Sequence, residues 1–256
     1  MINNKSENGT TLRIELNFSK YAHVYDKHAQ LQKLMAEKLA SFLPNDMPEQ
    51  ILEIGCGTGL FTKYLLAQPA QKIFLNDISD EMIGCMKLKL ALPPYSQIIA
   101  GNAELLKFPM VDMITANAVF QWFQDPRGVL IRLNSCIKPN SRLVFSTFGP
   151  SSLAELRGIT RLASPVSLLS DTEWNNLIKQ AGFTLSSSAN ESHRTFFPST
   201  LELLKNLQQM GAASTRMTNS RELRQLIKDY DQMYSTEQGV YANWELLYFS
   251  AINKQQ

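Results

Sequence analysis

Short apolar runs alternate with helical patterns along the N-terminal part of the chain. Runs rich in β-forming residues occupy 50–54, 72–77, 96–100, 111–117 and 142–148. Apolar residues return with the 3.6-residue period of a helix at 60–68, 80–92 and 129–137. Parallel strands need crossover connections, and these are usually helices. The alternation therefore predicts a doubly wound α/β sheet.

The pattern changes after residue 148. Helices are expected at 151–163, 171–181, 200–210 and 220–233, and strands at 183–197 and 244–252. The two later strands would complete a seven-stranded, Rossmann-like sheet that is mostly parallel and has an antiparallel last strand. The helices near 151–168 and 199–235 would then be insertions carried on this core.

One domain over 17–256 is predicted, preceded by a flexible leader over 1–16. Residues 18–42 are expected to form an N-terminal helix, because their apolar positions follow the helical period. Of the 256 residues, 44% are hydrophobic and 19% are charged, which is ordinary for a globular protein. A net charge of +2 favours neither nucleic acid nor a membrane surface as a partner.

The cysteines Cys56, Cys85 and Cys136 are too widely spaced to form a CxxC pair. We therefore expect a reducing, cytoplasmic setting and no metal site. No run approaches the roughly 20 apolar residues of a membrane span. The GxSxG motif of many hydrolases is also absent from the sequence, which argues against that chemistry.

A glycine-rich turn at 55–59 follows the first predicted strand and opens the first helix. Gly55, Gly57 and Gly59 would let the backbone turn tightly and approach a ligand. Many turns are rich in glycine, so the strand–loop–helix context carries most of this inference. A dinucleotide site would need Gly or Ala where Leu60 stands, and a P-loop would need a Gly-Lys-Ser/Thr ending that is absent.

Polar residues also follow the second and fourth strands. Asp77 ends the second strand about 20 residues after the first glycine, where an acid accepts hydrogen bonds from ribose hydroxyls. The alternative is that Asp77 caps the following helix. Ile78 would pack on an adenine face or in the core. Asn117 ends the fourth strand and is a candidate to orient the cofactor through its backbone or its amide.

Glu53 followed by G-x-G-x-G resembles the first motif of the class I S-adenosylmethionine (SAM)-dependent methyltransferases. In that superfamily the loop lies against the methionine and ribose parts of SAM. The third strand is followed by Gly101-Asn102-Ala103, where the superfamily has Gly-Asp-Ala and its acid meets the adenine amino group. The amide oxygen of Asn102 can accept the same hydrogen bond. A surface turn is the alternative.

Further segments resemble the malonyl-acyl carrier protein O-methyltransferases of biotin synthesis, and the similarity spans about 18–254. They are 18–20, 25–32, 117–122, 145–148, 152–156, 204–215 and 246–254. The resemblance implies methyl transfer from SAM to the free carboxyl of malonyl-acyl carrier protein or malonyl-CoA, giving the ester that primes pimeloyl synthesis for biotin. Together with the motifs above, it implies a cofactor site made of Tyr25, Gln32, Glu53, Gly55, Cys56, Gly57, Gly59, Asp77, Ile78, Asn102, Ala103 and Asn117.

A carboxylate acceptor is ionised at neutral pH, so its methylation needs no general base. Tyr21, Tyr25 and Gln121 are candidates to position the acceptor. The two tyrosines, four residues apart, are equally suited to one packing face of a helix. The N-terminal helix and the two insertions are candidate lids that would exclude water from the reaction.

Arginines in or beside the insertions are candidates for docking an acidic carrier protein, with a solvated surface charge as the alternative for each. They are Arg157, Arg161, Arg194 and Arg216. A monomer is expected. Two other functions stay open at this point. One is SAM-dependent methylation of another small carboxylate or a quinone-like acceptor, and the other is noncatalytic binding by a degenerate methyltransferase fold.

Overall fold

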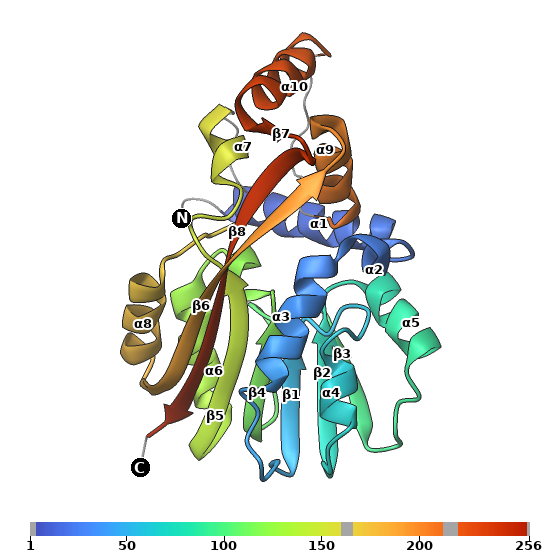
Figure 1. Ribbon diagram of the computed structural model, residues 1–256. Helices are drawn as coiled ribbons and strands as arrows, with labels where there is room; N and C mark the ends of the chain where they lie inside the picture. Colours follow the sequence, from blue (N-terminus) through green and yellow to red (C-terminus); the bar gives the residue numbers. More distant parts are fainter. Residues whose placement is uncertain (1–3, 160–165, 212–219, 255–256) are drawn as a thin grey trace.

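One mixed sheet with helices on both faces forms the centre of the protein (Figure 1). The computed structural model describes residues 4–159, 166–211 and 220–254. Within these residues the strand order is β3-β2-β1-β4-β5-β8-β6, and the short β7 pairs with β8. The strands are β1 Gln50–Ile54, β2 Lys72–Asp77, β3 Ser96–Ala100, β4 Val111–Asn117, β5 Ile137–Phe148, β6 Phe183–Phe197, β7 Ser235–Thr236 and β8 Gly239–Asn253.

The first five strands are parallel to one another, and β8 lies antiparallel between β5 and β6. The predicted fold class, a mostly parallel Rossmann-like sheet with an antiparallel last strand, is therefore confirmed. The chain crosses from β3 at the sheet edge back to β4 beside β1, so the winding reverses between β1 and β4. In open α/β sheets such a reversal leaves a crevice at the carboxyl ends of the strands, where ligands bind.

Helices cover both faces of the sheet and bury two apolar clusters. Met35 of α3 and Met86 of α5 are fully buried on one face, and Leu130 of α6 and Trp174 of α8 on the other. None of the helices in the described part of the chain is long and apolar enough to cross a membrane. The helices are α1 Asn4–Tyr21, α2 Tyr25–His28, α3 Gln30–Ala40, α4 Thr62–Leu66, α5 Asp80–Lys89, α6 Pro126–Ser135, α7 Ala154–Ile159, α8 Asp171–Gln180, α9 Thr200–Gln209 and α10 Ser220–Tyr234, with a 3₁₀ turn at Phe120–Trp122.

The strands β6 and β8, of 15 residues each, extend beyond the other strands and carry α7, α9 and α10 at their far ends (Figure 1). Tyr230 of α10 is buried there, and its hydroxyl donates a hydrogen bond to the carbonyl of Tyr241 at 2.8 Å. These helices fall within 151–168 and 199–235, the ranges where helical insertions were predicted. Parts of both insertions, 160–165 and 212–219, lie outside the described residues.

The N-terminal segment corrects one expectation. Residues 1–16 were expected to form a loose leader, but from Asn4 onward they are the greater part of the 18-residue helix α1. This helix has few apolar residues, and it is held by tertiary packing rather than by its own pattern. Ile14 is buried, and the Phe18 ring contacts two aromatic rings from other elements.

The helix expected over 18–42 is also interrupted. The structure has the end of α1, the four-residue α2 and the longer α3 in this range. The break before α3 falls at Ala29, whose ψ of 46° leaves the helical region and whose side chain is fully buried. These breaks let α1 and α2 cross above the carboxyl ends of the parallel strands (Figure 1).

Candidate functional site

The loop at 55–59 leaves β1 with three glycines in the left-handed region, where other residues are strained. The φ values are 65° at Gly55, 53° at Gly57 and 89° at Gly59. A Cβ on Gly55 would lie 2.3 Å from Cγ2 of Val119, so this glycine allows close packing against the segment after β4. A Cβ on Gly57 would meet nothing within 4 Å. Gly57 therefore leaves room for a ligand to approach the backbone.

Asp77, the last residue of β2, holds this loop in place. Its Oδ2 accepts a hydrogen bond from the Gly57 N–H at 2.7 Å, and its Oδ1 accepts one from the Ser79 N–H at 2.9 Å. Burial raises the pKa of Asp77 to about 6, although the backbone donors lower it. The carboxylate is thus ionised at neutral pH, and each oxygen keeps a lone pair for a further donor. The cap of α5 is Ser79, whose Oγ accepts from the Met82 N–H.

Two predicted cofactor residues have buried side chains, namely Glu53 on β1 and Cys56 within the loop. Thr62 donates a hydrogen bond to Oε2 of Glu53 at 2.7 Å. Burial raises the pKa of Glu53 to about 8, with a further contribution from the charge of Asp77, so this carboxyl holds a proton at neutral pH. Burial also raises the pKa of the Cys56 thiol. Both side chains support the loop from the inside of the fold.

The turn after β3 is fixed by Asn76, whose amide donates to the carbonyls of Ile99 at 2.8 Å and Gly101 at 2.9 Å. The Asn102 Oδ1 accepts a hydrogen bond from the Glu104 N–H at 2.8 Å. A carbonyl oxygen has two lone pairs, so one remains for a donor on a ligand. The turn therefore presents an amide oxygen to the crevice where the superfamily has a carboxylate.

Asn117 joins β4 to two neighbouring elements. Its amide nitrogen donates to the carbonyl of Gln32 at 3.0 Å, and its Oδ1 accepts from the Ser146 hydroxyl at 2.8 Å. The side chain of Asn117 is thus committed to the protein itself. Gln32 differs, because its Oε1 is buried and has no hydrogen-bond partner among the described residues.

Aromatic side chains cover the crevice. The Phe18 ring of α1 lies edge-on to Tyr25 of α2, with centroids 6.2 Å apart, and to Trp122 at 5.2 Å. Burial raises the pKa of Tyr25 well above its usual range, and the charges of Asp77 and Asp26 add to the shift. The Tyr25 hydroxyl therefore stays protonated and is able only to donate or accept a hydrogen bond.

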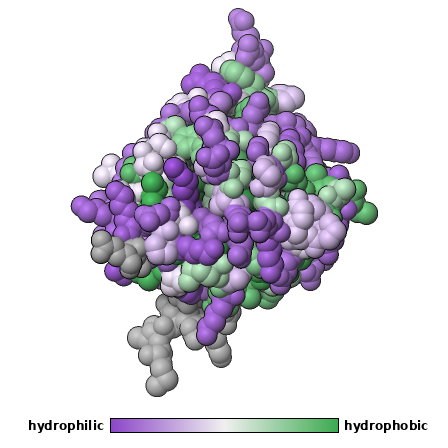
Figure 2. All heavy atoms as spheres, turned by 90° about the horizontal axis from the view of Figure 1, so that it is seen from below, coloured by the Kyte–Doolittle hydropathy of each residue, from purple (hydrophilic) through white to green (hydrophobic). Residues whose placement is uncertain are grey.

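These elements enclose a cavity of about 750 Å³, including its open mouth. Predicted cofactor residues that line it are Tyr25, Gly55, Gly57, Asp77, Ile78, Asn102, Ala103 and Asn117. The remaining predicted cofactor residues, Gln32, Glu53, Cys56 and Gly59, are not part of the wall. The surface at the end of the molecule opposite α7, α9 and α10 is mostly hydrophilic (Figure 2).

Two residues predicted to position an acceptor do not line this cavity. Gln121 is buried, its amide donates to the carbonyl of Ala118 at 2.7 Å, and its Oε1 accepts from Thr147 at 3.0 Å. The Tyr21 ring is half-buried and lies 5.1 Å from the ammonium of Lys20. The structure thus brings only Tyr25 of the three to the crevice.

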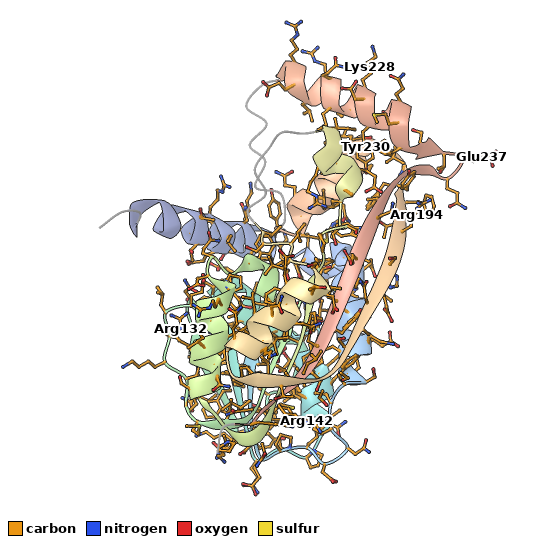
Figure 3. The ribbon with its side chains drawn as sticks, turned by 90° about the vertical axis from the view of Figure 1, so that its left-hand side faces the viewer. Arg132, Arg142, Arg194, Lys228, Tyr230 and Glu237 are labelled. Carbon is orange, nitrogen blue, oxygen red and sulfur yellow. The ribbon has the colours of Figure 1, made fainter. Side chains whose placement is uncertain are left out.

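Two of the four predicted docking arginines fall in the described residues. Arg157 on α7 donates to the carbonyl of Pro150. Arg194 on β6 donates to Oδ1 of Asn243 at 2.9 Å, and its guanidinium lies 4.1 Å from the Tyr241 ring centroid (Figure 3). Both side chains are exposed. Arg161 and Arg216 lie outside the described residues.

Sequence reasoning missed the contribution of α1 to the cavity. Thr11, Ile14 and Phe18 all line it. Their spacing of three and four residues places them on one face of a helix, which is the signal that was available. Trp122 also lines the cavity.

Comparison with known proteins identifies the family. A family model described as "Methyltransferase domain" matches residues 25–188. A malonyl-[acyl-carrier protein] O-methyltransferase from Halalkalibacterium halodurans is 33% identical, covering 92% of this chain and 96% of the relative. A protein of the same name from Brevibacillus brevis is 30% identical, with 94% and 96% covered. The chain belongs to the malonyl-[acyl-carrier protein] O-methyltransferase family.

This membership confirms the predicted resemblance and makes the chain a SAM-dependent O-methyltransferase. The fold is shared more widely. The YcgJ protein from Bacillus subtilis superposes with a TM-score of 0.65 at 15% identity, covering 87% of this methyltransferase and 99% of that chain.

The cavity residues fit SAM. Asp77 has free lone pairs for the ribose hydroxyls, and Gly57 leaves its backbone accessible. Gln32 is not part of the wall, but its buried Oε1 has no partner among the described residues and could accept from a donor such as the amino group of the methionine part if α3 shifts toward the ligand. When bound, SAM supplies an electrophilic methyl group on a sulfonium.

Proposed function

We propose that this methyltransferase transfers the methyl group of SAM to the free carboxyl of a malonyl group carried on acyl carrier protein. The product would be the malonyl methyl ester that primes pimeloyl synthesis for biotin. The observation that carries the proposal is the extent of the similarity. Relatives named for this reaction match 92% and 94% of the chain, well beyond the methyltransferase domain at 25–188.

The chemistry suits the side chains around the cavity. The malonyl carboxyl is ionised at neutral pH and attacks without a general base. Tyr25, with its raised pKa, is unsuited to act as a base, but its hydroxyl can donate a hydrogen bond. The work left to the protein is therefore to hold the two reactants in line and to exclude water. Positioning of this kind supplies up to about 7–11 kcal/mol of a barrier.

The acceptor would enter from the side of the insertions. The helices α1 and α2 cover the cavity. Helix α9 contacts α2 through one hydrogen bond, between Asn206 and His28 at 3.2 Å. We assign these helices, with α7 and α10, to a lid over the acceptor. Of the three positioning candidates, Tyr25 remains the best placed, whereas the buried, bonded amide of Gln121 favours a structural role.

The docking of the carrier is part of the same proposal. Arg157 and Arg194 are exposed on α7 and β6, at the end of the molecule that carries the insertions. Acyl carrier proteins are acidic, so cations at this end would favour their approach. The described cysteines are free, which suits a reducing compartment, and we expect a monomer acting in the cytoplasm.

The test uses SAM with a radiolabelled methyl group and three acceptors: malonyl-carrier protein, malonyl-CoA and free malonate. We expect label in a base-labile ester, with a much higher kcat/KM for malonyl-carrier than for malonate. Acetyl-carrier protein, which lacks the free carboxyl, is the matched control and should take no label. Equal rates on malonate and malonyl-carrier would reject the carrier-bound substrate.

A further inference from the structure

Helix α2 is too short to hold its own position. It has four residues, Tyr25–His28, no side-chain cap at its start and no fully buried side chain. Isolated helices of this length are unstable in water. Its place above the cavity must therefore be set by contacts with other elements, and the strongest of these converge on Asp26.

The carboxylate of Asp26 bridges two elements of the cofactor site. Its Oδ1 accepts a hydrogen bond from the hydroxyl of Thr58 at 2.5 Å, and its Oδ2 pairs with the ammonium of Lys89 at 2.5 Å. Its backbone carbonyl also accepts from the ammonium of Lys33 at 2.6 Å. Hydrogen bonds that involve a charged group are stronger than neutral ones.

The two partners of the Asp26 carboxylate belong to the glycine loop and to α5. Thr58, buried at 3% exposure, stands between the two glycines that follow Cys56 in the loop. Lys89 ends α5, the helix that begins after Asp77. Asp26 thus ties α2 to the loop and to α5 at once. The residue before it, Tyr25, lines the cavity beside Asp77.

Neighbouring contacts extend this tie. The hydroxyls of Ser19 on α1 and Ser79 at the start of α5 lie 2.9 Å apart. On the other side, His28 of α2 is bonded to Asn206 of α9. A Cβ on Gly211, just after α9, would lie 2.9 Å from the Phe18 ring. The short helix therefore stands between the cofactor loop and the insertion that we assign to the acceptor.

We propose that Asp26 is a positioning residue whose bridge from Thr58 to Lys89 holds α2 and Tyr25 closed over SAM and so limits the release of the cofactor. Cofactor exchange then requires this bridge to open. The inference rests on the SAM-dependent function but not on the identity of the acceptor.

The test measures the dissociation rate of radiolabelled S-adenosylhomocysteine after a chase with unlabelled ligand. We expect Asp26→Ala and Thr58→Val each to release it about tenfold faster, which corresponds to about 1.4 kcal/mol. Asp26→Ala combined with Thr58→Val should release it no faster than the faster single variant, because both remove one shared bond. Lys89→Met should give a smaller increase, since that pair is half-exposed. Lys87→Met, exposed on the same helix, is the matched control and should match wild type.

A wild-type release rate in both Asp26→Ala and Thr58→Val, with unchanged melting temperature, would overturn the proposal. Multiplying effects in the double variant would also overturn it, because the two side chains would then act separately. If Asp26→Ala fails to fold, Thr58→Val decides by its own release rate, and Asp26→Asn, which keeps an acceptor for Thr58 but loses the charge that faces Lys89, should match Lys89→Met. Hydrogen exchange of the 24–28 amides should rise in step with release. If the wild type failed to methylate malonyl-carrier, the proposed acceptor would be rejected, but the comparison of release rates among the variants would still hold.

Discussion

Asp77→Ala removes the carboxylate that we assign to the ribose of SAM. In the structure this group also accepts hydrogen bonds from the Gly57 N–H at 2.7 Å and the Ser79 N–H at 2.9 Å. The variant thus loses a contact with the ligand and also loses the hydrogen bond that holds the glycine loop. Leaving buried polar partners unpaired costs about 1–3 kcal/mol. We therefore expect SAM to bind about 5- to 150-fold more weakly.

Titration calorimetry with SAM measures this loss. Asp80→Asn is the matched control, because it removes one exposed negative charge in the first turn of α5 without touching the loop. Its affinity should stay near that of wild type. Unchanged affinity in a folded Asp77→Ala protein would refute the ribose assignment. An equal loss in both variants would attribute the effect to overall charge instead.

The pH dependence of binding gives a second reading of the same carboxylate. Burial raises the pKa of Asp77 from 3.8 to about 6, so the group gains a proton below that pH. If SAM binds the ionised form, its affinity should fall by up to about tenfold per pH unit below pH 6. Asp77→Ala should lose this slope. The same slope in the variant would mean that another group is responsible.

Other predictions concern neighbouring parts of the molecule. Burial raises the pKa of Glu53 from 4.5 to about 8, so between these pH values the folded state keeps a proton that the unfolded state loses. The free energy of unfolding therefore falls as the pH rises through this range, by up to about 1.4 kcal/mol per pH unit. Glu53→Gln should therefore melt above wild type at pH 8 in thermal denaturation, and a lower melting temperature there would contradict this. Gly57→Ala should weaken SAM binding about tenfold or more, because its Cβ would point into open space, and should lower the melting temperature only through the left-handed strain that Gly55→Ala shares. Gly55→Ala should instead lower the free energy of unfolding by about 1–3 kcal/mol through overpacking, measured by urea denaturation. If Gly55→Ala mainly weakened SAM binding and Gly57→Ala mainly lowered stability, the roles assigned to the two glycines would be reversed. Arg194→Ala should raise the KM for malonyl-carrier at low salt and leave kcat unchanged, and unchanged kinetics would remove Arg194 from the docking surface.

The parallel core was predictable because strands such as β1 and β2 are buried on both faces and read as continuous apolar runs. β1 and β2 begin and end where the sequence pattern placed them. The glycine loop and Asp77 were predictable for a related reason. Their roles depend on position at strand ends, and strand ends can be read from the chain.

The cover over the site was harder to predict. Helix α1 buries Ile14 but leaves Leu12 and Leu16 exposed, so its few apolar residues do not form one continuous stripe, and the pattern suggested a leader. The break at Ala29 depends on tertiary packing, which local periodicity does not report. Gln121 has a side chain that could bind an acceptor, yet its amide nitrogen donates to the carbonyl of nearby Ala118 and its Oε1 accepts from Thr147 on β5.

The role of Asp26 could not be inferred from spacing. It lies 32 residues from Thr58 and 63 residues from Lys89, and only the fold brings the three side chains together. Long-range polar contacts of this kind leave no local signal in the sequence.

The central claim is that the malonyl carboxyl on a carrier protein receives the methyl group of SAM. Intact-protein mass spectrometry of malonyl-carrier incubated with SAM and the enzyme tests it most directly. We expect a carrier heavier by one methyl group, which mild base removes, and no change in a carrier loaded with an acetyl group. A malonyl-carrier of unchanged mass, with the enzyme binding SAM normally, would contradict it.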